Sequence, residues 1–81
     1  MTASVFTTEY EIFRSLLQKH RLEMSITQDA VAQYLKRPQS FVSKYESGER
    51  RLDVVEFLAI ARFLEIDLVS FFNNLKKETD I

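Results

Sequence analysis

The sequence predicts an all-α fold, a compact arrangement of five short helices, and three observations carry that prediction. Apolar residues recur three and four positions apart, the spacing of one face of a helix. Three segments open with the same pattern, a polar residue bracketed by an apolar residue before it and another four positions after it. The 81 residues include one glycine and one proline, so we expect short connections between helices. The length suits one small domain, which we expect to span residues 1–81.

The first helix is predicted from an apolar stripe formed by Phe6, Tyr10, Phe13 and Leu17. Thr8 and Glu11 have the spacing of a capping box, in which each side chain meets the other residue's backbone N–H. We therefore expect this helix to run from about Thr8 to about Leu22.

Three later helices are predicted to begin at an N-cap, a polar residue that accepts a hydrogen bond from the first turn. Each cap is preceded by an apolar residue and followed, four residues on, by another, the pattern of a hydrophobic staple. The caps are Thr27, Asp53 (with Glu56 completing a capping box) and Asp67. They predict helices at about 28–36, 54–64 and 68–76. Between the first two lies the segment RPQSFVSKYESG at 37–48, predicted to be helical over about 39–46.

Composition argues against several functional classes. There is no cysteine, so neither a disulfide nor a thiolate metal site is expected. His20 is the only histidine and has no evident nucleophile or base beside it, and no glycine-rich phosphate loop is present. We expect no enzyme, no cofactor and no bound metal. No secretory signal or membrane span is expected either, because the apolar run around 57–64 is short and broken by Arg62. We therefore expect a cytoplasmic protein.

Charge is unevenly distributed along the chain. The net charge of −1 argues against nucleic acid as a partner, but residues 36–51 hold five positive and two negative side chains. Residues 52–81 hold three positive and six negative ones. The cluster indicates either an anionic partner or chance grouping on a solvated surface.

The predicted helix at 39–46 has a face with hydrogen-bonding groups and no carboxylate. At about 100° per residue, an arc of about 140° holds Gln39, Ser40, Ser43 and Lys44. Val42 and Tyr45 lie opposite and are expected to pack inward, with Phe41 on the flank. Glutamine matches the major-groove edge of adenine and lysine can reach guanine, so this face suits base recognition. An ordinary solvated helix with small polar residues is the alternative.

The order of these segments resembles the Cro/C1-type (XRE-family) helix-turn-helix. The resemblance rests on ITQDAVA at 26–32, QSFVSKYESG at 39–48 and the continuation RRLDVVEFLAIARFLEIDL at 50–68. It covers about residues 12–72, leaving a short N-terminal extension and a polar, frayed tail from Lys76 to Ile81. It implies a lambda-repressor-like domain whose third helix enters the major groove of double-stranded DNA.

The resemblance implies a role for each matching residue. It places Gln39, Ser40 and Lys44 at base edges, with Ser43 close by. Phe41 is expected either against a thymine methyl or the sugar edge, or partly buried. Arg21 and Glu46 are implied to form a partly buried ion pair between the first and third helices. The residues expected at the DNA backbone are Gln28, Arg37, Ser47, Arg50 and Arg51, although the last two arginines suit an ordinary charged surface as well.

The chain also departs from the family pattern. Lys36 and Glu65 stand where the family often has the glycine that ends a helix, so those turns are expected to be strained or built differently. Arg37 replaces a usual apolar turn residue. Pro38 replaces a Ser/Thr N-cap, which removes a capping hydrogen bond but leaves a backbone suited to a helix start.

The resemblance implies a transcriptional regulator, expected to be a repressor that binds a palindromic operator as a homodimer. Phage-type repressors and restriction–modification controllers fit equally. The expected dimer surface is Phe63, Leu68, Phe72 and Leu75, because the last helix, which also holds Phe71, has more apolar residues than a small monomer requires. The alternative is that these residues complete the monomer core. An antitoxin or protein-interaction adaptor with the same fold is the alternative function.

Overall fold

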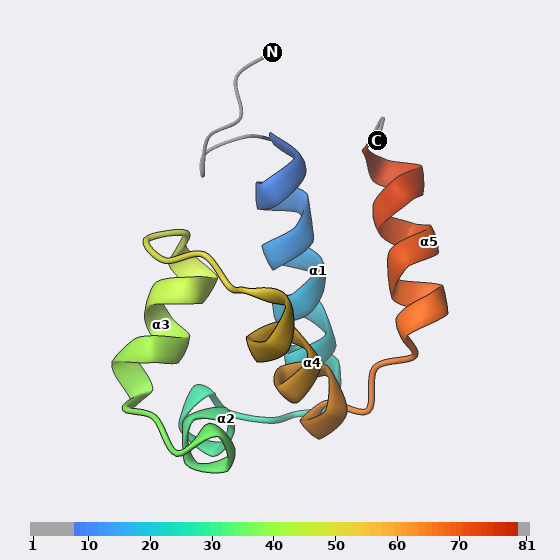
Figure 1. The fold of residues 1–81 in the computed structure, drawn as a ribbon. Coiled ribbons are helices and arrows are strands. Elements are labelled where there is room, and N and C mark those ends of the chain that lie inside the picture. Colours follow the sequence, from blue (N-terminus) through green and yellow to red (C-terminus); the bar gives the residue numbers. More distant parts are fainter. Residues whose placement is uncertain (1–7, 80–81) are drawn as a thin grey trace.

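The computed structural model describes residues 8–79, which form five helices and no strand (Figure 1). The helices are α1 (Thr8–Glu23), α2 (Gln28–Leu35), α3 (Gln39–Ser47), α4 (Val54–Phe63) and α5 (Leu68–Glu78). The predicted all-α class and all five predicted helices are confirmed. Within the described range no helix is both long and apolar enough to cross a membrane. Phe6, expected on the apolar face of the first helix, lies outside the described residues.

The three predicted N-caps are confirmed. The Thr27 hydroxyl accepts a hydrogen bond from the Ala30 N–H at 3.0 Å. Asp53 and Glu56 form a complete capping box, with distances of 2.7 and 3.0 Å. The Asp67 carboxylate accepts from the first turn of α5. Pro38 precedes α3 with φ −63° and no side-chain cap, as its ring predicts.

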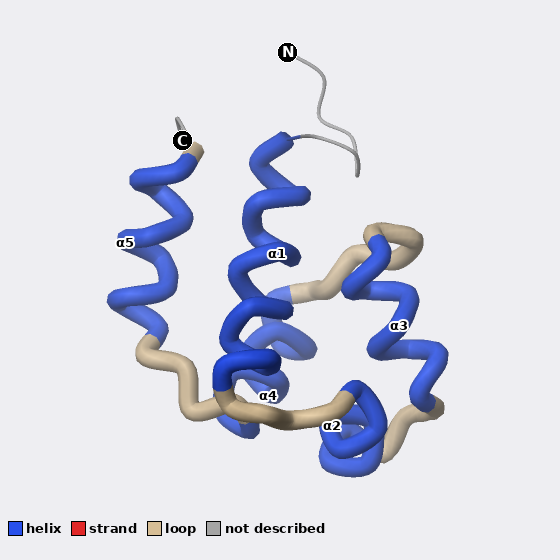
Figure 2. Tube along the Cα trace, turned by 180° about the vertical axis from the view of Figure 1, so that it is seen from behind, coloured by secondary structure: helices blue, strands red, loops and turns tan. Residues whose placement is uncertain are grey.

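The core lies where α1 meets the other helices. α1 and α5 run side by side in opposite directions, while α2 and α3 lie on the other side of the molecule (Figures 1 and 2). Phe13, Phe57 and Phe71 join α1, α4 and α5, with ring centres 5.3–5.9 Å apart. Val42 and Tyr45 of α3 are buried, as their places on the helix predict. α3 is thereby fixed by its apolar side, and its polar side faces outward.

The prediction of a frayed tail from Lys76 is wrong for residues 76–79. α5 continues to Glu78, and the buried Thr79 ends it by donating from both its N–H and its hydroxyl to the Leu75 carbonyl. Two lysines in the last turn favour this extension because they oppose the negative end of the helix dipole. Residues 80 and 81, the end of the predicted tail, lie outside the described residues.

Four helices are followed within two residues by a residue with left-handed backbone, and only one of these residues is glycine. Ser25, Lys36 and Glu65 have φ of 57°, 57° and 56°. In each case the next N–H reaches back to the carbonyl five residues earlier, the Schellman arrangement. Gly48 ends α3 with φ 91°, and a Cβ there would lie 3.0 Å from the Arg14 guanidinium. The single glycine thus stands where a side chain has little room as well as an unfavourable φ.

The left-handed residues predict a simple gain in stability. Glu65→Gly should raise the free energy of unfolding by about 0.5–1 kcal/mol, because glycine adopts positive φ without the steric cost that other residues carry. Urea denaturation measures the change. Glu65→Ala is the matched control, since alanine removes the same side chain but keeps the Cβ; an equal gain in both variants would contradict the backbone explanation.

Candidate nucleic-acid interface

The outward face of α3 carries the predicted polar residues. Gln39, Ser40, Ser43 and Lys44 are all exposed. α3 lies at the edge of the fold, on the opposite side of α1 from α5 (Figures 1 and 2). The only carboxylate of this helix, Glu46, is turned inward and is 7% exposed. An anionic partner can therefore approach the outward face of α3 without meeting a negative side chain from this helix.

Glu46 forms a buried ion pair with Arg21 of α1. The Arg21 Nε donates to Oε2 at 2.7 Å and Nη2 donates to Oε1 at 3.0 Å, so the contact is bidentate. The Arg21 Nη1 also donates to the Ile26 carbonyl at 2.7 Å, just before α2. This one arginine therefore links α1, the loop that leads to α2, and α3. Burial, reinforced by the Glu46 charge, raises the pKa of Tyr45 beside it, so that phenol stays neutral.

The Glu46 carboxylate also sets the direction of a chain of side-chain amides. The Gln28 Nε2 donates to Glu46 Oε1 at 2.8 Å, and the Gln39 Nε2 donates to Gln28 Oε1 at 3.0 Å. An ionised carboxylate only accepts hydrogen bonds, so Gln28 must turn its NH₂ inward and its oxygen toward Gln39. Gln39 must then donate to Gln28. The orientation of the Gln39 amide therefore follows, through Gln28, from the buried charge of Glu46.

Arg14 makes a second connection between α1 and α3, which the sequence reasoning missed. Its Nη1 donates to the Glu46 carbonyl at 2.8 Å, and its guanidinium lies against Gly48. Gln18 adds a longer contact, 3.3 Å from its Nε2 to the Glu46 carboxylate. The helical spacing of Arg14, Gln18 and Arg21 on α1 was the available signal, because it puts three polar side chains on one side of that helix.

Phe41 gathers two arginines beside the outward face. The guanidinium carbons of Arg37 and Arg50 both lie 4.6 Å from the centre of its ring, a cation–π distance. Phe41 itself is 8% exposed, so the structure favours burial over an exposed ring. The arginines come from the turn before α3 and the loop after it. Phe41 thus brings together positive charges that are distant in sequence.

Glu56 of α4 neutralises part of this charge. Its two oxygens accept from Arg50 Nη1 and Nη2, each at 2.9 Å, and Oε2 lies 3.5 Å from Arg37 Nη2. The hydrogen bond with Arg50 lowers the pKa of the Glu56 carboxyl and raises that of Arg50. The sequence predicted Glu56 only as a capping residue. Nothing in the local pattern indicates its pairing with Arg50, which depends on the path of the intervening loop.

The other residues predicted at a DNA backbone are Gln28, Arg51 and Ser47. Gln28 is the first residue of α2. Arg51 is exposed, with its guanidinium 4.7 Å from the centre of the Tyr10 ring. The Ser47 hydroxyl contacts the Lys44 carbonyl and the Glu49 carboxylate at 3.2 and 3.3 Å.

Comparison with known proteins decides the family. The helix-turn-helix family model matches residues 17–71, which include α2, α3 and the buried ion pair. The chain belongs to the XRE-type helix-turn-helix family. An XRE-family like protein from Pseudomonas syringae pv. tomato str. DC3000 is 42% identical, with a TM-score of 0.81 over 88% of this chain and 87% of that one.

A second solved structure shows the same XRE-type fold. It is a mutant of the restriction-modification controller protein C.Esp1396I, 29% identical, with a TM-score of 0.78 over 89% of this chain and 91% of that one. Curated protein sequences give no significant match. Membership of this helix-turn-helix family makes the protein a DNA-binding transcriptional regulator, with α2 and α3 as its helix-turn-helix.

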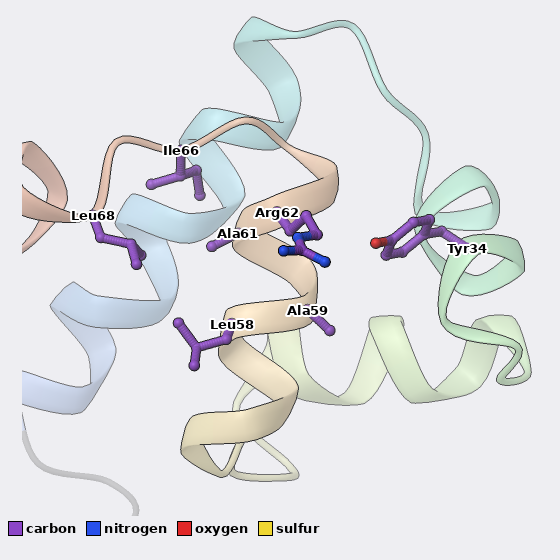
Figure 3. Close-up of a pocket in the computed structure, with 7 residues that line it drawn as sticks. All are labelled: Tyr34, Leu58, Ala59, Ala61, Arg62, Ile66 and Leu68. Atoms are coloured by element: carbon purple, nitrogen blue, oxygen red, sulfur yellow. The ribbon is translucent and has the colours of Figure 1, made fainter.

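The residues predicted at a dimer surface of this XRE-type domain lie in different surroundings. Phe63 stacks on Tyr34 of α2, with ring centres 4.5 Å apart. Leu68, with Leu58, lines a surface pocket of about 390 Å³ that extends across α4 to Tyr34 of α2 (Figure 3). Phe72 is 44% exposed, while Leu75 is partly buried. Phe71, at 1% exposed, is part of the core, so completing the monomer core explains that residue.

The buried ion pair yields a stability prediction. Glu46→Gln should lower the free energy of unfolding by about 3 kcal/mol or more, because it leaves the Arg21 charge buried without its counter-ion. Urea denaturation at neutral pH measures it. Glu49→Gln is the control, since it removes the same charge three residues later at an exposed position and should change stability by under about 0.5 kcal/mol. Equal losses in both variants would contradict the role of the pair.

Proposed function

We propose that the protein is a repressor that binds a palindromic operator in double-stranded DNA as a homodimer, reading the major groove with α3. The observation that carries the proposal is the exposed α3 face, which has Gln39 at its start, two serines and a lysine, and no carboxylate. Family membership supplies the DNA-binding class.

Base recognition is assigned to Gln39, Ser40, Ser43 and Lys44. Gln39 uses one amide N–H on Gln28, so its other N–H and its oxygen are available for the donor–acceptor pair on adenine. The fixed amide makes this contact directional. Lys44 lies more than one turn further along and can reach guanine O6 or N7. The serines are short enough to let the helix approach the bases closely.

Contacts with the DNA backbone are assigned to Gln28, Arg37, Ser47, Arg50 and Arg51. Gln28 is at the N-terminus of α2, where side chain and backbone N–H groups favour a phosphate. Arg37 precedes α3, Ser47 is its last residue, and Arg50 and Arg51 follow it, so these residues border the base-reading face at both ends. This arrangement is what a helix held across the groove requires, because phosphates border the groove on either side.

The homodimer is assigned to the side of α4 and α5 that carries Leu68, Phe72 and Leu75, together with Phe63. Phe72 and Leu58 are each 44% exposed, and Val69 is 71% exposed, so apolar side chains reach the surface on both helices. A two-fold contact here would pair the same surface with itself. It would also leave the α3 helices free to enter successive major grooves about 34 Å apart.

The base-reading proposal is tested by selecting bound fragments from random or genomic DNA and sequencing them. The wild type should enrich an inverted repeat. On that site Gln39→Ala and Lys44→Ala should each cost about 1–3 kcal/mol and relax preference at one position. Unchanged affinity in both variants would overturn the base contacts. An absence of enrichment at low as well as moderate salt would favour the protein-partner alternative, because phosphate binding strengthens as salt falls.

The dimer is tested by sedimentation. The wild type should sediment as a dimer at tens of micromolar, and Phe72→Gln should weaken association by about tenfold or more, as expected for a central apolar contact. Leu22→Gln is the matched control, because Leu22 is also an exposed apolar residue, 59% exposed, but lies on α1 and is not among the residues assigned to the dimer surface. A wild-type monomer at that concentration would contradict the dimer.

A further inference from the structure

Arg37 and Arg50 form a site suited to one anion. Both guanidiniums lie 4.6 Å from the centre of the Phe41 ring, which holds them near each other despite their like charge. Phe41 is almost buried, so its position is set by the core. Arg37 precedes α3 and Arg50 follows it, and their side chains remain 46% and 39% exposed. The site therefore opens to solvent at the edge of the base-reading helix.

The Glu56 carboxylate occupies that site. It accepts from Nη1 and Nη2 of Arg50 and lies 3.5 Å from Arg37. This is the end-on, two-point geometry with which an arginine holds a phosphate, so a phosphate at the same place would need the same two donors. Glu56 is 15% exposed and is also tied to its own helix, since Oε1 accepts from the Asp53 N–H at 3.0 Å.

We propose that Glu56 is an internal competitor for a DNA phosphate, which must displace its carboxylate from Arg50 before this arginine can hold DNA. The inference rests on the proposed function, because it concerns the phosphate contacts of that same interface. Its consequence is selectivity: every phosphate that approaches meets the same competition, and only a site that also satisfies α3 compensates for it.

Two features make the exchange feasible. Ion pairs at a protein surface are weak in water, and the Arg50 side chain is 39% exposed, so the pair with Glu56 is open to exchange. The capping hydrogen bond to Asp53 stays in place when the arginine leaves, so α4 keeps its N-terminus and the carboxylate keeps a partner. Charge favours the phosphate, since one carboxylate faces two guanidiniums and leaves the site net positive.

The experiment compares Glu56→Gln with the wild type in binding a random-sequence 20-base-pair duplex across a range of salt concentrations. Glutamine retains the side-chain oxygen of the capping box but lacks the charge. We expect at least about threefold tighter binding at 50 mM salt and a log–log salt slope steeper by about 0.9, the value for one additional phosphate. Affinity equal to or below that of the wild type overturns the proposal.

Two further comparisons make the result specific. Glu49→Gln removes the same charge next to Arg50 but leaves the guanidinium contacts with Glu56 in place, because the Glu49 carboxylate contacts Ser47. This variant should bind the duplex as the wild type does. A gain in affinity equal to that of Glu56→Gln overturns the proposal. In an Arg50→Gln background the gain in affinity from Glu56→Gln should disappear, and its survival overturns the proposal.

If Glu56→Gln unfolds, Glu56→Asp replaces it, since the shorter carboxylate keeps its charge but draws back from Arg50. Tighter duplex binding by Glu56→Asp again supports the proposal, and unchanged binding overturns it.

The comparison also separates this proposal from the proposed function. If the wild type enriches an operator and Glu56→Gln binds the random duplex no better, only the competition fails. If the wild type enriches no operator but Glu56→Gln gains duplex affinity through Arg50, the anion site and its competitor are supported and specific base reading fails.

Discussion

The polar architecture of this protein depends on the pair between Arg21 and Glu46. On a helix proposed to face DNA, a carboxylate is unfavourable in two ways. When it is exposed it repels phosphate, and when it is buried without a partner it is costly to desolvate. The bidentate contact with Arg21, both side chains under 10% exposed, removes the first problem and offsets the second. Because Arg21 also holds the Ile26 carbonyl, the same contact fixes where α2 begins.

The fixed charge of Glu46 also orients the side-chain amides that connect it to the surface. The carboxylate accepts only, which determines the orientation of Gln28 and, through it, that of Gln39 at the surface. A surface glutamine normally loses side-chain entropy when it binds, a cost of up to about 2 kcal/mol for such a side chain. Here part of that ordering is already present in the fold. The buried ion pair thus orients residues proposed to contact DNA, although neither of its own members is proposed to contact DNA.

The sequence predicts what is local and misses what depends on the path of loops. The caps at Thr27, Asp53 and Asp67 were predictable because an N-cap and its partners lie within four residues of one another. The pairing of Glu56 with Arg50 was not, since both residues also fit simpler local roles. The outward face of α3 followed from helical geometry, whereas the Arg21–Glu46 pair came from family resemblance: no periodicity joins residues 25 positions apart. The tail prediction failed because polar composition says little about one further turn of an existing helix.

The charge of the whole chain is a poor guide to its function for a reason visible around α3. The net charge is −1, yet the nearby carboxylates are each engaged: Glu46 with Arg21, Glu56 with Arg50, and Glu49 with a serine hydroxyl. An engaged carboxylate still contributes to net charge but much less to the field that an approaching phosphate meets, because a paired cation lies within 3 Å of two of them. Lys44, by contrast, extends from the exposed face of α3. The electrostatic attraction for DNA therefore depends on which charges the fold leaves unpaired at the surface. A few contacts between helices determine which charges those are.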